Sequence, residues 1–382
     1  LSVDLNAAMQ AEQMARQAAE AAVAAALPQV SAHLRDVARN PRFREAVTWQ
    51  NRKVLTDSVD VLLRTPLERR NSQARQQEQL ITNYLQRYCA KNESIGFFGP
   101  IGWGAWCDSG PTLAQRHADQ LVIARKTRFE FWALAALAEA FSQDPALRPW
   151  LAPRRDSRLH LDGRRLVDAE GLAHDLSTAM ARLLAACDGV TAARDIAARL
   201  VTDPDSDRQS EADVFAVLED AVARGFVAWS LEVPVGPDPE SALADMLAKL
   251  GDAGLRARLT AVFNELRSAR DRVAAAAGNA EALDAALGEL EATFSRVTGY
   301  APYQRHGRVY AGRGLVYEDC RRGVELDVGP DLRARVAAPL ALILQSARWY
   351  SHAIAARFSS HLRSLYEESR AHRAAEPLPV AA

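Results

Sequence analysis

The segment Arg87–Gly104 has the sequence Arg-Tyr-Cys-Ala-Lys-Asn-Glu-Ser-Ile-Gly-Phe-Phe-Gly-Pro-Ile-Gly-Trp-Gly. A helix is predicted before its end, from about residue 72 to residue 90, because apolar residues recur there at intervals of three and four. Beyond Ile95, closely spaced glycines and aromatics disfavour a helix, so we expect a tight turn that leads into a strand ending near Trp106. The segment therefore joins a helical region to a sheet.

The predicted helix also has a polar stripe that ends at the glycine turn. Its members are spaced by four residues and are Arg75, Gln79, Asn83, Arg87 and Lys91. Two cations thus lie beside glycines, whose backbone amides can approach a ligand closely. This combination suits a phosphate or a carboxylate. A solvated helix face followed by a structural turn would have the same spacing, so both interpretations stay open.

The rest of the chain predicts an α+β fold that is predominantly helical and has several subdomains. Asn40-Pro41 is typical of a helix start, a strand is predicted over 121–125, and a helix over 129–141. Asp162-Gly163 lies between short alternating runs and predicts a hairpin. Three helices and a strand follow up to residue 235, which together with the hairpin is a winged-helix arrangement. We expect domains at 1–156, 157–236 (the winged helix) and 237–382.

The last domain is predicted to contain long helices up to residue 297 and a strand-like stretch over 309–328. Two helices are expected to close the chain, over 331–347 and 348–371, with a break at Pro339, because proline disrupts a helix interior. The alanine-rich start, over 7–27, contains Gln, Glu and Arg and predicts a surface or packing helix, not a signal peptide.

The overall charge is close to zero, with 47 basic and 48 acidic residues among 382. Binding of a polyanion would therefore need a local patch. Between Arg35 and Lys91 there are 12 basic and 6 acidic residues, and clustered cations bind phosphate backbones. The candidate residues for binding a phosphate backbone are Arg42, Arg44, Arg52, Lys53, Arg69 and Arg70. An arginine-rich surface without a ligand would have the same composition.

The winged helix is predicted to bind peptide and not DNA. Its third helix contains the acidic run Glu211–Asp220, which would repel phosphates. A sheet edge beside a helix can instead accept an extended peptide as an added strand. The candidate peptide-binding residues are Arg165, Leu166, Val167, Phe215 and Leu218. A packing domain without a ligand explains the same pattern.

The run Tyr317–Arg322 alternates acidic and basic residues on a predicted strand. Side chains alternate between the two faces of a strand, so Glu318 and Cys320 are expected on one face and Asp319 and Arg321 on the other. The acidic residues could form surface ion pairs or provide an active-site acid.

Several common classes of protein lack support in the sequence. The four cysteines are far apart, which predicts free thiols in a reducing cytoplasm and no metal site. No apolar run approaches the ~20 residues that span a bilayer. There is also no Walker loop, GxSxG, HExxH or Rossmann glycine motif, which removes the main sequence support for several enzyme classes.

The segment Arg87–Gly104 resembles the most recognisable stretch of lantibiotic dehydratases, specifically their N-terminal domain. In that family a helix ending in Arg-x-x-x-Arg runs into a Ser/Thr-Pro-Phe-Gly-x-Phe turn. Arg87 and Lys91 match the two basic positions, and Gly96 and Phe98 match the Gly-x-Phe.

Three departures place the chain beside a divergent branch with the pattern Lys-Asn-Glu-(Ser/Thr)-Ile-Gly-Phe-Phe-Gly-Pro. Lys91 replaces the second Arg, Glu93 stands where the family has a Thr important for amino-acid transfer, and Ser94 replaces Pro. The segment 157–236 is similar to the precursor-peptide recognition element of these pathways. Val316–Asp319 resembles the strand that supplies a family Asp needed for glutamylation.

The resemblance implies an enzyme of ribosomal-peptide natural-product (antibiotic) biosynthesis. It would transfer glutamate from glutamyl-tRNA to Ser or Thr of a precursor peptide in the cytoplasm, with the loaded tRNA as co-substrate and no other cofactor. Arg87 and Lys91 would hold the tRNA acceptor end or the glutamyl carboxylate, and Glu93 and Ser94 would line the turn. The six candidate residues of the basic patch would bind the tRNA backbone. Asp319 would position the donor or accept the proton of the attacking hydroxyl.

The resemblance further implies an incomplete aminoacyl-transfer domain, with glutamate elimination left to a separate partner protein; a homodimer is an open alternative. One rival function is a peptide aminoacyl-tRNA ligase, which adds an amino acid to a peptide C-terminus. The other is a non-catalytic scaffold that only binds the precursor peptide. Water loss from the peptide would support dehydration and the gain of one residue would support ligation, whereas the scaffold predicts binding without any dependence on tRNA.

Overall fold

The computed structural model describes residues 2–91, 96–168, 171–203, 210–304 and 314–372. The fold is α+β and 64% helical, as predicted. The first half has the elements α1 (Ser2–Arg39), α2 (Pro41–Val54), η1 (Leu55–Val59), α3 (Asp60–Arg64), α4 (Ser72–Ala90), η2 (Gly96–Phe98), β1 (Ile101–Trp106), β2 (Leu113–Phe129), α5 (Phe131–Ser142), η3 (Arg148–Trp150), β3 (Arg154–Arg155), β4 (His160–Asp162), β5 (Arg165–Val167) and β6 (Ala173–Asp175). The second half has α6 (Thr178–Ala186), α7 (Ala193–Thr202), α8 (Glu211–Ala223), β7 (Val227–Ala228), α9 (Pro239–Ala248), α10 (Ala253–Ala275), α11 (Ala280–Thr298), β8 (Val316–Val328) and α12 (Pro330–His372).

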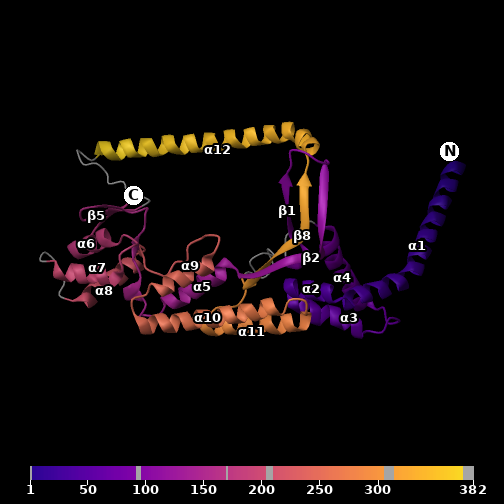
Figure 1. Cartoon of the computed structure of the whole chain (residues 1–382), viewed down its shortest axis with the longest axis horizontal. Helices are drawn as coiled ribbons and strands as arrows, with labels where there is room; N and C mark the ends of the chain where they lie inside the picture. The colour runs from indigo at the N-terminus through magenta and orange to yellow at the C-terminus, as the bar shows by residue number, and fades with distance from the viewer. Residues whose placement is uncertain (1, 92–95, 169–170, 204–209, 305–313, 373–382) are drawn as a thin grey trace. The chain divides into compact units, whose positions relative to one another are not determined.

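The chain divides into two compact units (Figure 1). Unit 1 comprises Leu1–Pro100 and Arg125–Cys320, and unit 2 comprises Ile101–Ala124 and Arg321–Ala382. The domain boundaries that the sequence predicts near residues 156 and 236 stay predictions.

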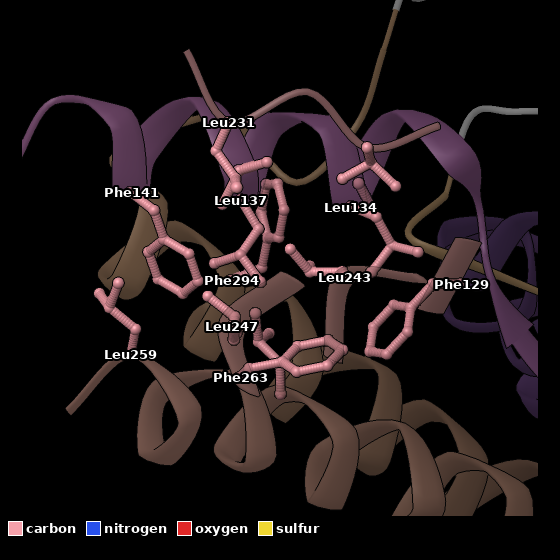
Figure 2. Packing of buried hydrophobic residues seen from close by; sticks show 14 of the residues in the cluster. Phe129, Leu134, Leu137, Phe141, Leu231, Leu243, Leu247, Leu259, Phe263 and Phe294 are labelled. Atoms are coloured by element: carbon pink, nitrogen blue, oxygen red, sulfur yellow. The ribbon is translucent and has the colours of Figure 1, made fainter. Parts of the chain in front are cut away.

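The largest hydrophobic core of unit 1 forms where α5, α9, α10 and α11 meet. Figure 2 shows α5 directing Leu134, Leu137 and Phe141 into this core, at intervals of three and four that place them on one helix face. The residues that they meet come from the end of β2, from the three other helices and from the segment before α9; they are Phe129, Leu231, Leu243, Leu247, Leu259, Phe263 and Phe294. The helices α10 and α11 are thus packed into this core through their buried residues.

A second core joins the N-terminal helices of unit 1. Asn40 caps α2 by accepting hydrogen bonds from the backbone N–H groups of Arg42 and Phe43, and Asn71 caps α4 in the same manner. The helix predicted over 72–90 and the start predicted at Asn40-Pro41 are both confirmed.

A third core lies among α6, α7, α8 and the short strands around them. The predicted hairpin is present as β4 and β5, and Gly163 in its turn has the positive φ of 56° that glycine tolerates. The three helices and the following strand β7 occur in the predicted order, and β7 pairs with β3. The identification of this region as a winged helix stays a prediction.

Unit 2 contains a three-stranded sheet in the order β1-β8-β2, with β1 parallel to β8 (Figure 1). Gly323 of β8 lies so close to β2 that a Cβ there would be 2.1 Å from the carbonyl oxygen of Gln120. The strand predicted over 121–125 is longer than expected, because the polar residues of its first half gave no strand pattern.

The predicted break at Pro339 is wrong: α12 is one helix from Pro330 to His372. Proline removes a single helical N–H, and the helix is exposed around this position, so water can bind the carbonyl group left without that partner. Within the described residues, no helix of the chain combines the length and the apolar character that crossing a membrane requires.

We expect Phe263→Ala to lower the free energy of unfolding by about 3–5 kcal/mol, because it removes a wholly buried ring from the largest core. The control Phe358→Ala truncates an exposed ring on α12 and should change stability by less than about 0.5 kcal/mol. Urea unfolding followed by circular dichroism measures both variants. Equal effects would contradict the assigned core.

Candidate functional site

Unit 1 contains a cavity of about 930 Å³. Its walls come from the end of α2, the glycine turn η2, the start of α5, the segment before α9, α11 and the start of β8. The lining residues are Thr48–Lys53, Gly96, Phe98, Arg128–Phe131, Leu134, Val235–Glu240, Leu287, Leu290, Glu291, Pro302–Gln304 and Gly314–Asp319. The helix α2 is interrupted at Asn51, where the backbone is extended (φ −163°, ψ 95°).

The glycine turn forms one wall of this cavity. Gly96 has a φ of +53°, which favours glycine, and a Cβ there would be 3.6 Å from Oε2 of Glu318. The Phe98 ring packs on Tyr88 of α4, with the ring centroids 4.7 Å apart, and the buried Phe97 ring lies 4.8 Å from the guanidinium carbon of Arg125. The tight turn predicted between helix and strand is therefore confirmed, and it places Gly96 and Phe98 at the cavity.

The guanidinium of Arg125 connects two buried carboxylates behind the turn. It donates two hydrogen bonds to Glu318, of 2.7 and 2.9 Å, and one of 2.7 Å to Glu45 of α2. Glu45 also accepts a 2.8 Å hydrogen bond from the backbone N–H of Gly278. Only 1% of the Glu318 side chain and 3% of the Glu45 side chain are exposed. Buried carboxylates need such partners because an unpaired charge in the interior is costly.

Burial alone would lower the pKa of the Arg125 guanidinium. The hydrogen bonds and negative charges of Glu318 and Glu45 outweigh this effect, so its pKa is raised above the ordinary value. Arg125 therefore stays charged at every pH at which the protein is folded, and the cluster is a permanent ionic connection between α2, β2 and β8.

Asp319 lies on the opposite face of β8 from Glu318, as the strand alternation predicts. Its carboxylate is exposed, and Oδ2 is 3.3 Å from Nε of Arg128. The start of β8 is fixed by two hydrogen bonds: Glu130 N–H donates to Leu315 O (2.9 Å), and Trp132 Nε1 donates to Gly314 O (3.0 Å). Asp319 can thus accept a proton or a hydrogen bond from a molecule in the cavity.

The neighbours of Asp319 on the strand differ in their chemistry. Burial and then the charge of Asp319 raise the pKa of the Tyr317 hydroxyl, which remains protonated and can donate a hydrogen bond. Burial and then Glu318 raise the pKa of Cys320, whose thiol lies 3.2 Å from Oε2 of Glu318 on the buried face. A buried thiol with a raised pKa is a poor nucleophile.

Three of the residues predicted for the site line this cavity, namely Asp319, Arg52 and Lys53. Arg52 is bound by Asp284 (2.5 Å) and Glu291 (2.6 Å) of α11.

The other predicted catalytic residues have different positions. Arg87 is half-buried on α4, Lys91 is exposed just after its end, and neither is among the lining residues. Glu93 and Ser94 lie outside the described residues. A pocket shared by Arg87, Lys91 and Asp319 therefore stays a prediction.

The remaining candidates for tRNA binding are partly neutralised by ion pairs. Arg44 pairs with Asp60 and Glu281, and Arg70 pairs with Glu78. Arg42 and Arg69 are exposed. Acidic residues of α11 pair with Arg44 and Arg52, so the cationic surface is smaller than the composition of residues 35–91 suggests. Residues 35–91 alone could not indicate these partners.

The candidates for peptide binding are mostly part of the third core. Leu166 and Leu218 are fully buried, and Phe215 stacks on Trp229 with an interplanar angle of 5°. Arg165 is exposed and Val167 half-buried, but both lie on β5, the central strand of the sheet β4-β5-β6. An added peptide strand would have to pair with β4 or β6 instead, because β5 already has two neighbours.

Sequence reasoning missed Glu45, Arg125 and Arg128. The sequence contains one sign that Glu45 is buried, because this carboxylate lies among the apolar residues Phe43, Ala46 and Val47 of α2. Among the residues that the structure describes, no three His, Cys, Asp or Glu side chains come together as a metal site.

The family model for the N terminus of lantibiotic dehydratase matches residues 39–372. The chain therefore belongs to the lantibiotic dehydratase family. No curated protein sequence matches the chain significantly.

Solved structures share its fold at low sequence identity. The tRNA-dependent lantibiotic dehydratase MibB from Microbispora sp. 107891 has a TM-score of 0.57 and 17% identity, covering 81% of this chain and 29% of that chain. The glutamylation domain TbtB from thiomuracin biosynthesis has a TM-score of 0.58 and 18% identity, covering 88% of this chain and 39% of that chain. The same domain bound to 5′-phosphodesmethylglutamycin has a TM-score of 0.56 and 17% identity, covering 81% and 36%. The chain thus spans about a third of the length of these neighbours.

We expect Arg125→Met to lower the free energy of unfolding by about 3–5 kcal/mol, because it leaves two buried carboxylates without their common partner. The control Arg116→Met removes exposed ion pairs from the same strand and should have a far smaller effect. Urea unfolding at neutral pH compares the two. A similar loss in both would show that Arg125 does not hold the cluster together.

Proposed function

We propose that this chain uses the cavity at Asp319 to transfer a glutamyl group from glutamyl-tRNA to a Ser or Thr hydroxyl of a precursor peptide. The observation that carries the proposal is an exposed carboxylate, Asp319, in a cavity next to the glycine-aromatic turn of the family motif. Membership of the lantibiotic dehydratase family supports it, as does a shared fold with a glutamylation domain and with a tRNA-dependent dehydratase.

The proposed reaction exchanges one ester for another. The peptide hydroxyl attacks the carbonyl carbon of the glutamyl ester, and the bond between that carbon and the ribose oxygen of the tRNA breaks. Asp319 accepts the proton of the hydroxyl as it attacks, and the ribose oxygen of the departing tRNA takes up a proton. The donor ester is already activated, so the reaction needs no nucleotide-binding loop. The sequence contains no Walker loop.

The walls of the cavity suit the loaded end of a tRNA. Phe131 and Tyr317 are partly exposed aromatics, on which a terminal adenine can stack. Lys53 is an exposed cation at the same wall and can bind a phosphate. We place the reaction in the cytoplasm, where tRNA is charged, and glutamate elimination on a separate partner protein.

We expect the chain to increase the mass of its precursor peptide by one glutamyl residue per modified hydroxyl, and only when glutamyl-tRNA is supplied. Mass spectrometry detects the adduct, with the chain alone and with the proteins encoded beside it. Tandem spectra locate the adduct, and mild base distinguishes a side-chain ester from an amide at the C-terminus. An amide at the C-terminus would indicate a peptide aminoacyl-tRNA ligase, and peptide binding with no adduct would indicate a scaffold.

Asp319→Asn should reduce the rate of transfer by about 10²–10⁴-fold, because an amide cannot accept the hydroxyl proton. Asp327→Asn is the matched control, since Asp327 lies on the same strand in an ion pair with Arg116 and outside the cavity. Single-turnover transfer of radiolabelled glutamate gives both rates. Unchanged transfer by Asp319→Asn would show that Asp319 does not accept the hydroxyl proton.

Lys91→Ala should abolish transfer and leave the affinity for the precursor peptide intact, if the helix end binds the loaded tRNA as the family motif implies. Fluorescence anisotropy with a labelled peptide measures the affinity, and the same transfer assay measures the rate. Normal turnover would show that tRNA binding does not involve this end of α4.

A further inference from the structure

Arg128, near the end of β2, brings a cation into the cavity next to Asp319. Its Nε lies 3.3 Å from Oδ2 of Asp319, and its side chain is 30% exposed. Arg125 and Arg128 are three residues apart on the strand, so their side chains lie on opposite faces. Arg125 shares its face with the buried residues Thr127 and Phe129, whereas Arg128 lines the cavity. The two arginines therefore have different roles.

The hydrogen-bonding capacity of Arg128 is unused, in contrast to that of Arg125. Arg125 donates three hydrogen bonds to two carboxylates. Within the part of the chain that the structure describes, no group accepts a hydrogen bond from Arg128, although its Nε is buried. Asp319 is its only acidic partner there, and this contact is an ion pair without hydrogen-bond geometry. Leaving N–H donors unpaired in a partly buried position is unfavourable, so the guanidinium is ready to bind a ligand.

Asp238 is a second carboxylate of the cavity wall that Arg128 influences, but it is bound elsewhere. It accepts hydrogen bonds from the backbone N–H and the hydroxyl of Ser241 at the start of α9. These two hydrogen bonds lower the pKa of Asp238, and the charges of Lys126 and Arg128 lower it further. Asp238 therefore senses the charge of the guanidinium without occupying its donors.

The cavity offers a negatively charged substrate little other free positive charge. The described residues that line it include three bases and six acids. Arg52 is already bound by two carboxylates of α11, and Lys53 comes from the end of α2, not from the strands that carry Asp319 and Arg128. An anionic group near Asp319 would therefore be repelled unless it met Arg128, because like charges brought together are costly.

We propose that Arg128 binds the side-chain carboxylate of the glutamyl group on the loaded tRNA, and thereby selects glutamate as the amino acid that is transferred. The inference rests on the proposed function. An aminoacyl ester has no free α-carboxylate, so the side-chain carboxylate is the only acid of the glutamyl group. A short carbon chain joins it to the ester carbon, and Asp319 receives the proton of the hydroxyl that attacks this carbon. A guanidinium beside Asp319 is within reach of that carboxylate and can bind both of its oxygens.

The test uses stable amide analogues of the loaded tRNA end, in which glutamate or glutamine is attached to the amino group of 3′-amino-3′-deoxyadenosine. The two amino acids differ only in a side-chain carboxylate or amide, and each analogue is made with and without a 5′-phosphate. Isothermal titration calorimetry with this chain measures the four affinities. We expect the chain to bind the glutamyl analogues about 10–100-fold more tightly than the glutaminyl analogues.

Arg128→Met should abolish this preference and leave two quantities unchanged, the affinity for the glutaminyl analogues and the gain in affinity from the 5′-phosphate. Arg128→Lys keeps the charge without the planar guanidinium and should retain part of the preference. The matched control is Lys126→Met, which removes a cation from the same face of β2 but outside the lining residues of the cavity. It should bind all four analogues like the parent chain. Far-ultraviolet circular dichroism confirms that each variant is folded, and Arg128→Gln replaces Arg128→Met if that variant does not fold.

Several results would overturn the inference. One is a parent chain that binds the glutamyl and glutaminyl analogues equally well. Another is a preference that persists in Arg128→Met, or an equal loss of affinity for all four analogues in this variant. Loss of the gain from the 5′-phosphate, with the preference intact, would assign Arg128 to the tRNA backbone instead. A parent chain that binds none of the analogues and forms no glutamyl adduct in the mass-spectrometric assay would contradict the proposed function itself, which separates the two failures.

Discussion

One guanidinium, that of Arg125, connects three segments that are distant in the sequence. It binds Glu45 of α2, Glu318 of β8 and the ring of Phe97 in the glycine turn. Each carboxylate is buried and would be costly without this cation. The arrangement of the cavity depends on these contacts of Arg125. Asp319 directly follows Glu318 on β8, and Gly96 and Phe98, on either side of Phe97, line the cavity. The glycine motif of the sequence is therefore a structural wall of the site as well as a family signature.

Local features of the fold could be predicted because their causes lie within a few residues. Asn40 and Asn71 cap their helices through their own side chains, and Gly163 provides the positive φ of a tight hairpin turn. The apolar intervals of α4 gave its full extent. The predicted helix break at Pro339 was wrong because the effect of proline depends on its surroundings, and α12 is exposed to water there.

The site was only partly predictable because its decisive contacts are nonlocal. Strand alternation was enough to separate Glu318 from Asp319. The partner of Glu318 is 193 residues away, and the contact of Arg125 with Glu45 spans 80 residues. The same limit applies to Arg44 and Arg52, since a count of charges over residues 35–91 does not include their acidic partners on α11. Leu166 and Leu218 illustrate the same limit, because their packing into a core depends on residues distant in the sequence.

In the proposed reaction, the loaded end of a tRNA binds in the cavity at Asp319. The most direct test is a crystal structure of this chain with 5′-phosphodesmethylglutamycin, the compound bound to the TbtB glutamylation domain. We expect the compound to occupy the cavity, in contact with Asp319 and with Gly96 or Phe98 of the turn. Binding at another surface, or a cavity that remains empty at saturating concentrations of the compound, would contradict it.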